Sequence, residues 1–211
     1  MDFLNNIPYL NLLTDSSTRP RILAVLAFFA NLAFACLKLA FGLYARSWWL
    51  ISLGFYYGVL AFLRLSLVRC LWQPQRYNAR RLYRRTALLL NLLTFAMAGI
   101  FVQLVRNDES FRYPDVLIYA MALWAFIKII SAIVNLVRPG HDPAPVPSAL
   151  RCLSFAAALM SIQALQTALI SRFSADSIRF AHLMNGILGA VITFLMLLLS
   201  IGMLLRSAKQ R

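Results

Sequence analysis

The chain has 211 residues, of which 61% are hydrophobic and only 13% are charged. Soluble domains carry roughly 45–50% apolar and about 25% charged residues, so this composition excludes an ordinary soluble fold and favours a polytopic membrane protein. The net charge is +14, but most basic residues flank apolar segments. That placement is typical of membrane-topology signals and anionic-headgroup contacts, and it argues against a nucleic-acid partner.

Residues 1–20 precede the first long apolar segment. Their apolar side chains are compatible with a short interfacial segment broken at Pro8, and equally with a disordered cytoplasmic lead. The apolar segment that follows is longer than the roughly 7–15-residue core of a signal peptide, so we expect it to remain as a membrane helix.

Six segments approach or exceed the roughly 20 apolar residues needed to cross about 30 Å of hydrocarbon. Backbone polar groups must be paired in lipid, so each segment is predicted to be helical. The sequence thus predicts an all-α bundle of six transmembrane helices, forming one domain over residues 21–211 with no C-terminal cytoplasmic domain. The predicted helices are about 22–45, 48–68, 87–105, 115–137, 150–171 and 178–205.

Two connections have distinct character. Only Arg46 and Ser47 separate the first two helices, which predicts a tight hairpin. The segment 139–147 contains four prolines and one glycine, which predicts a stiff, helix-free linker that separates a four-helix part from a two-helix part.

The distribution of basic residues predicts the orientation. With the N-terminus inside, thirteen Lys and Arg residues fall on the cytoplasmic side and five on the other. The positive-inside rule therefore predicts that both termini face the cytoplasm. We expect the membrane to be the plasma (inner) membrane. The residues expected to contact anionic headgroups at the inner face are Arg76, Arg80, Arg81, Arg84 and Arg85.

Three basic residues, Lys38, Arg64 and Lys128, lie inside apolar segments, whereas none of the seven acidic residues does. A charge at the bilayer centre costs at least about 2.5–3.5 kcal/mol, so such residues are usually functional or structurally partnered. Because all three residues are basic and no carboxylate accompanies them, a transport path for cations is not expected. A contact with an anion, a contact with a lipid headgroup and a purely structural role are all compatible with these residues. Arg64 is close enough to the inner interface to snorkel, but Lys128 is too deep and should point into the bundle.

Other polar residues line helical faces within the spans. Asn31 shares a face with Lys38, and Lys128 shares one with Trp124, Ser131 and Asn135. Interhelical hydrogen bonds contribute about 0.6–2 kcal/mol each, and most such residues serve only to hold helices together. For the residues on these faces, both a structural role and a solute-binding role stay open. The candidate solute contacts on these faces are Asn31, Lys38, Lys128, Asn135, Gln163, Gln166 and Asn185.

No catalytic set is visible in the sequence. The spans contain no paired aspartates, no serine–histidine pair and no H-E-x-x-H, and the three cysteines form no C-x-x-C. We therefore expect neither an enzyme nor a bound metal or cofactor.

The first hairpin resembles the cation diffusion facilitator family of zinc and manganese transporters. The residues that carry the resemblance are Asn31, Lys38, Gly42 and Ser47. The segment 147–151 is similar to the entry to the family's fifth helix, and the segment 184–207 is similar to its last helix. The resemblance implies a six-helix bundle with both termini inside. It also implies metal ligands in the second and fifth helices, but the matching positions here hold Tyr56, Leu60, Ala156 and Met160, which are poor ligands for divalent cations.

These observations predict a transporter-like integral membrane protein that does not use the family's metal site. Its solute would be uncharged or anionic, and Tyr56 joins the candidate contacts because of its place in the resemblance. The alternative is a non-transporting scaffold or regulatory subunit that packs against a second copy, another membrane protein or lipid. The two alternatives differ in whether the bundle interior holds a polar site.

Overall fold

The computed structural model describes residues 19–106, 115–137, 144–173 and 178–209. The described residues form six helices, each long and apolar enough to cross a membrane, which confirms the predicted all-α, multi-pass architecture. The helices are α2 (Arg19–Tyr44), α3 (Trp48–Trp72), α4 (Ala79–Arg106), α5 (Asp115–Val137), α6 (Pro145–Phe173) and α7 (Ile178–Lys209). The N-terminal lead predicted over residues 1–20 lies almost entirely outside the described residues.

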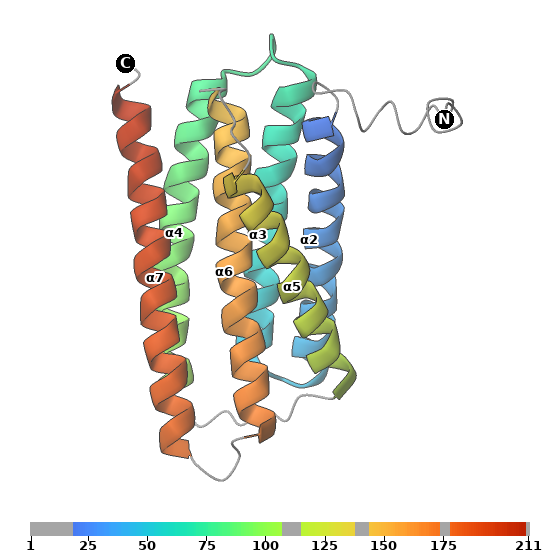
Figure 1. The fold of residues 1–211 in the computed structure, drawn as a ribbon, viewed down its shortest axis with the longest axis vertical. Coiled ribbons are helices and arrows are strands. Elements are labelled where there is room, and N and C mark those ends of the chain that lie inside the picture. Colours follow the sequence, from blue (N-terminus) through green and yellow to red (C-terminus); the bar gives the residue numbers. More distant parts are fainter. Residues whose placement is uncertain (1–18, 107–114, 138–143, 174–177, 210–211) are drawn as a thin grey trace, which may run out of the picture.

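The helices run up and down the bundle, and α2 begins at the same end at which α7 finishes (Figure 1). Helices α3 and α6 form the centre, because 56% and 61% of the residues in their apolar 18-residue stretches are buried, against 28–39% in the other four helices. Around them, α2 packs on α3, α7 packs on α4, and α5 packs on α6 at an angle (Figure 1). Because α6 contacts α3 and α4 as well as α5 and α7, the bundle is not divided after the fourth span as the proline-rich segment had suggested.

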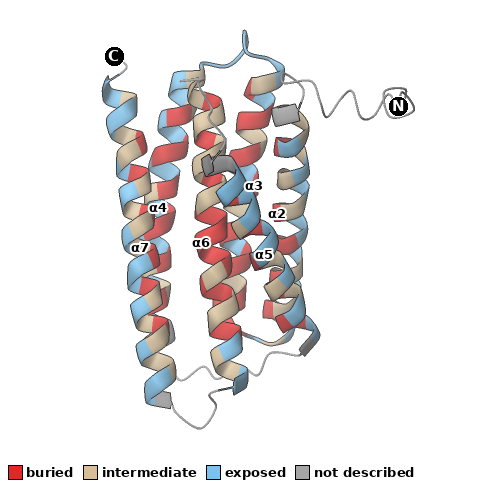
Figure 2. Ribbon diagram, in the orientation of Figure 1, coloured by how far each residue is buried: buried red, intermediate tan, exposed pale blue. Residues whose placement is uncertain are grey.

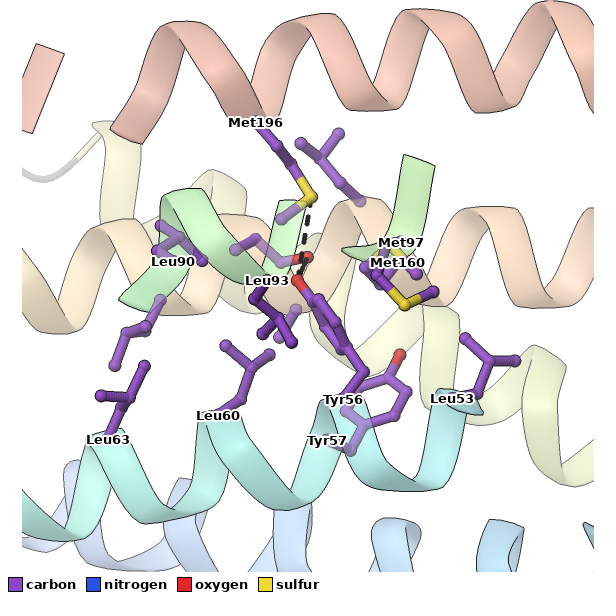
Figure 3. Packing of buried hydrophobic residues seen from close by; sticks show 14 of the residues in the cluster. Leu53, Tyr56, Tyr57, Leu60, Leu63, Leu90, Leu93, Met97, Met160 and Met196 are labelled. Atoms are coloured by element: carbon purple, nitrogen blue, oxygen red, sulfur yellow. Dashed lines mark hydrogen bonds between the residues drawn. The ribbon is translucent and has the colours of Figure 1, made fainter. Parts of the chain in front are cut away.

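The core is built from large apolar side chains that converge on α3 and α6. Figure 3 shows Leu53, Tyr56 and Leu60 of α3 pointing toward Met160 of α6 and Met196 of α7. The outer faces are also apolar, and Figure 2 shows exposed residues along the outside of the peripheral helices, whereas those of α6 lie only near its C-terminal end. Exposed aromatic and aliphatic side chains along whole spans are what a surface in contact with lipid requires.

Two helices begin earlier than their apolar segments do. Helix α4 begins at Ala79 instead of residue 87, because Asn78 caps it by accepting a hydrogen bond from the Arg81 N–H at 3.1 Å. The arginines of this region therefore lie on helical turns. Helix α6 begins at Pro145, within the segment predicted to be free of helix, since proline is well tolerated in the first turn, where its missing N–H leaves no bond unmade.

The α2–α3 hairpin is as tight as its two-residue connection predicts. The Ser47 N–H donates to the Gly42 carbonyl at 3.0 Å, and the Ser47 hydroxyl caps α3 by accepting from the Leu50 N–H at 3.5 Å. The two helices then approach closely at Gly42 and Gly54, where a Cβ atom would lie under 3.0 Å from atoms of the partner helix. This contact fixes the face of α2 that meets the rest of the bundle.

Candidate functional site

Lys128 joins α5 to α2 through a buried hydrogen bond. Its ammonium donates to the Asn31 side-chain carbonyl, and Lys128 is 6% exposed while Asn31 is fully buried. The side chain thus points into the bundle, as its depth in the span predicts. Ser131, which shares a face of α5 with Lys128, is exposed and takes no part in this contact. The side chain of Asn135, a further candidate, lies outside the described residues.

Lys38 is the second buried ammonium on this side of the bundle. It is fully buried, and its Nζ has no hydrogen-bond partner among the described residues. The nearest favourable contact is the ring of Phe34, one turn away on α2, whose centroid lies 5.1 Å from Nζ. A cation–π contact is worth up to about 2 kcal/mol when desolvated, which is less than the cost of burying an unpaired ammonium.

Aromatic side chains lie between these two lysines. Phe34 of α2 and Trp124 of α5 are stacked with centroids 4.4 Å apart and planes 12° apart. Tyr57 of α3 meets Phe34 edge-on at 5.4 Å, and its hydroxyl faces Trp124 and Ser161 without forming a hydrogen bond. Trp124 in turn lies under the Lys128 ammonium, 4.4 Å from ring centroid to Nζ.

Arg64 is buried, contrary to the expectation that it reaches the inner interface. It is 3% exposed and donates from Nη2 to the Ser154 hydroxyl of α6 at 2.8 Å, while its Nε has no partner among the described groups. The small side chains of α6 let α3 pack against it along this stretch, so the guanidinium finds a partner across the interface. Arg64 also lies close enough to Lys128 for the two charges to interact.

The remaining candidates lie on the other side of α6. Gln166 donates to the Met184 carbonyl at 2.9 Å, and Asn185 accepts from Thr167 at 3.3 Å, so both serve to join α6 and α7. Gln163 is fully buried, and neither its nitrogen nor its oxygen has a described partner. The structure thus brings Asn31, Lys38 and Lys128 together and assigns Gln166 and Asn185 to a separate helix contact.

The positions at which the resembled family binds metal do meet in the core. The Tyr56 hydroxyl donates to the Ala156 carbonyl at 3.5 Å, and Leu60 and Met160 belong to the same apolar cluster (Figure 3). Among the described residues, no three His, Cys, Asp or Glu side chains gather as a metal site would require. A comparison of the sequence with protein-family models finds no match, and neither does a comparison with curated proteins.

The cluster on the α2 side, which we name the basic interior, consists of Asn31, Lys38, Tyr57, Arg64, Trp124 and Lys128. It combines three buried basic side chains with several polar atoms that no described group satisfies. Among the side chains that the structure describes, no carboxylate lies against these basic groups. Chemically, the basic interior offers donors and positive charge, which is the complement of an anion.

The sequence placed Trp124 on the same face as Lys128, but Phe34 beside Lys38 and the stacking of the two rings were not predicted. Phe34 precedes Lys38 by four residues, and Trp124 precedes Lys128 by four. Lysine side chains on a helix point back toward its N-terminus, so a residue four positions earlier lies under the ammonium. This repeated aromatic–lysine spacing was the available signal for the aromatic pair.

A second basic region lies where α3 ends and α4 begins. A cavity of about 250 Å³ is lined here by Val68, Arg69, Trp72, Gln73 and Tyr77. The following helix carries Arg80, Arg81, Arg84 and Arg85 in its first two turns, without an acidic residue in the first turn. Positive side chains at a helix N-terminus oppose the helix dipole, so this end favours an external anion. We propose that anionic lipid headgroups fill that role.

Substitution of Arg81 and Arg84 by glutamine should weaken the stabilisation that anionic lipid provides. Each basic residue near such a surface is worth about 1 kcal/mol. The measurement is the melting temperature in phosphatidylcholine nanodiscs with and without phosphatidylglycerol. The matched control is R172Q/R179Q, which changes two exposed arginines at the opposite end of the bundle. An equal loss in both double variants would contradict a specific site at the α3–α4 end.

Proposed function

We propose that the chain is an integral membrane protein that binds a small anion in the basic interior and carries it across the bilayer. The observation that carries this proposal is the burial of Lys38, Arg64 and Lys128 without an acidic partner among the side chains that the structure describes. Uncompensated charges in a low-dielectric interior are strongly destabilising, whereas a bound anion would pair with them. A purely structural bundle would gain stability by replacing them with apolar residues.

The depths of the three cations support a path across the bundle. The end of α2 and the start of α3 lie at the same level, since the hairpin turn joins them (Figure 1). With a rise of 1.5 Å per residue, Lys38 lies about 9 Å from that level and Arg64 about 24 Å. Lys128 lies between them, about 20 Å from that level, because it bonds to Asn31. An anion would therefore meet positive charge in successive steps.

We further propose that both termini face the cytoplasm and that the bundle is a diverged relative of the cation diffusion facilitators. The first proposal is supported by the basic residues at the α3–α4 connection, which lies at the end where α2 begins and α7 finishes (Figure 1). The second is supported by the facing of Tyr56 and Ala156 across α3 and α6. In such a relative, apolar packing has replaced the metal site and the transported charge has changed sign.

Reconstitution in proteoliposomes tests the transport proposal. Wild-type protein should carry at least one anion of a panel of chloride, nitrate, bicarbonate, phosphate and acetate, with flux independent of zinc and manganese. The K128M and K38M variants should fold but lose at least tenfold in flux, because the anion loses its counter-charge. The matched control is K209M, which makes the same change at an exposed position at the end of α7 and should retain full flux.

Two outcomes would contradict the proposal. Flux that survives in K38M and K128M would remove the basic interior from the path. Wild-type vesicles that pass no anion of the panel would instead favour the scaffold or regulatory alternative, in which the buried lysines serve only to fix α2 and α5.

A further inference from the structure

The basic interior is divided by Trp124 and by Phe34, which stacks on it. Along α2, Asn31, Phe34 and Lys38 follow one another at intervals of about one turn, and α5 runs in the opposite direction with Trp124 one turn before Lys128 (Figure 1). Lys128 therefore approaches the aromatic pair from the side of Asn31, and Lys38 approaches it from the hairpin side. Both directions agree with the tendency of lysine to lean toward the helix N-terminus.

The geometry of the stack places the two ammonium groups on its outer faces. The rings of Phe34 and Trp124 are separated by 4.4 Å at an angle of 12°, which leaves no room for a third group between them. Lys38 lies 5.1 Å from the Phe34 centroid and Lys128 lies 4.4 Å from the Trp124 centroid. The inner face of each ring is covered by the other ring. Lys38 must therefore contact the outer face of Phe34, and Lys128 the outer face of Trp124.

We propose that Phe34 and Trp124 divide the basic interior into two anion subsites, one at Lys38 and one at Lys128 and Asn31. The division rests on the proposed function, since it names the subsites of the same anion path. Each subsite presents one ammonium against an aromatic face, which suits a small, singly charged anion. Tyr57 closes the third side of the stack, so an anion can pass from one subsite to the other only when the aromatic pair moves apart.

The subsites differ in how firmly their ammonium is held. Lys128 is anchored by its bond to Asn31, whereas Lys38 has only the ring of Phe34. Transfer of an anion into the Lys38 subsite therefore breaks no hydrogen bond, and the lysine is free to turn toward the ligand. The Lys128 subsite offers a second donor, because Asn31 Nδ2 has no described partner.

Fluorescence quenching by iodide tests the division without measuring transport. Trp124 is the only one of the four tryptophans near Lys128, so the W48F/W49F/W72F variant makes it the sole reporter. Adding F34W and W124F to that variant moves the reporter to the Lys38 side. Iodide supplied at the end where α2 begins should quench the Trp124 reporter, and iodide supplied at the hairpin end should quench the F34W/W124F reporter. Caesium, a cationic quencher, should quench neither.

The lysine variants complete the test. K128M should abolish quenching of the Trp124 reporter and leave the F34W/W124F reporter unchanged, and K38M should do the reverse. If W49F unfolds the protein, Trp49 is retained in every variant. The Trp124 signal is then the difference in fluorescence between W48F/W72F and W48F/W72F/W124F. Quenching of both reporters from the same end, or of neither by iodide, would overturn the division. Because flux is measured separately, vesicles that pass no anion but show the expected quenching would refute transport and keep the two subsites.

Discussion

Replacement of Gly54 by alanine is expected to destabilise the bundle by about 1–3 kcal/mol, the usual cost of overpacking a tight contact. A Cβ atom at Gly54 would lie 2.7 Å from Leu39 Cγ and 3.0 Å from the Leu39 backbone nitrogen. Side-chain rotation alone cannot relieve a clash with backbone, so α2 and α3 would have to separate. That separation would also displace Phe34 and Lys38, which α2 carries on neighbouring turns.

Gly58 provides a matched control on the same helix. A Cβ atom there would meet nothing within 4 Å, so of these two α3 glycines, which are four residues apart, only Gly54 serves a close contact. Alanine has a higher helix propensity than glycine by about 1 kcal/mol, so G58A should leave the free energy of unfolding unchanged or raise it slightly. Reversible unfolding in mixed micelles of increasing SDS fraction measures both variants. Equal destabilisation in G54A and G58A would show that the close approach does not limit stability.

The second large effect is expected for Asn31. Replacement by leucine removes the acceptor of the Lys128 ammonium and leaves a buried charge without a partner, which should cost about 3 kcal/mol. The K128M variant should be milder, because the charge itself disappears and only a neutral amide loses its bond. The N31L/K128M double variant should recover most of the loss, since two apolar side chains then meet.

A double-mutant cycle measures this coupling directly. The free energies of unfolding of the wild type, the two single variants and the double variant are compared in the same micelles. An N31L variant as stable as K128M would indicate that Lys128 reaches another acceptor or water when its asparagine is lost. That result would also weaken the assignment of Asn31 to an anion subsite.

The six spans and the inward direction of Lys128 were predictable from the sequence. Span length and the cost of unpaired backbone in lipid restrict a long apolar segment to one structure, and depth prevents Lys128 from reaching either interface. The Asn31–Lys38–Gly42 face was predictable for the same reason, since all three residues are buried on one side of α2. These predictions depend on local spacing and on distance from the membrane surface.

The pairing of helices was not predictable in this way. Lipid tails are as apolar as the core, so hydropathy does not distinguish the face of a helix that meets protein from the face that meets lipid. Asn91 of α4 donates a hydrogen bond to Ser200 of α7 at 2.9 Å, and Arg64 of α3 donates one to Ser154 of α6. The partners in each pair are far apart in the sequence, and no sequence pattern predicts either contact. The prediction that Arg64 extends to the inner membrane interface was wrong, because it considered only the distance to that interface and not an acceptor on a neighbouring helix.

The pairing of α4 with α7 has a consequence for biosynthesis. The hairpin of α2 and α3 can close as soon as it leaves the ribosome, but α4 must wait for a partner whose last residue is Lys209. At about 5–20 residues per second, synthesis of the chain from the end of α4 to the end of α7 takes roughly 5–20 s. During that interval the face of α4 that carries Asn91 is open to lipid or to an insertion chaperone, and the bundle becomes complete only with the final helix.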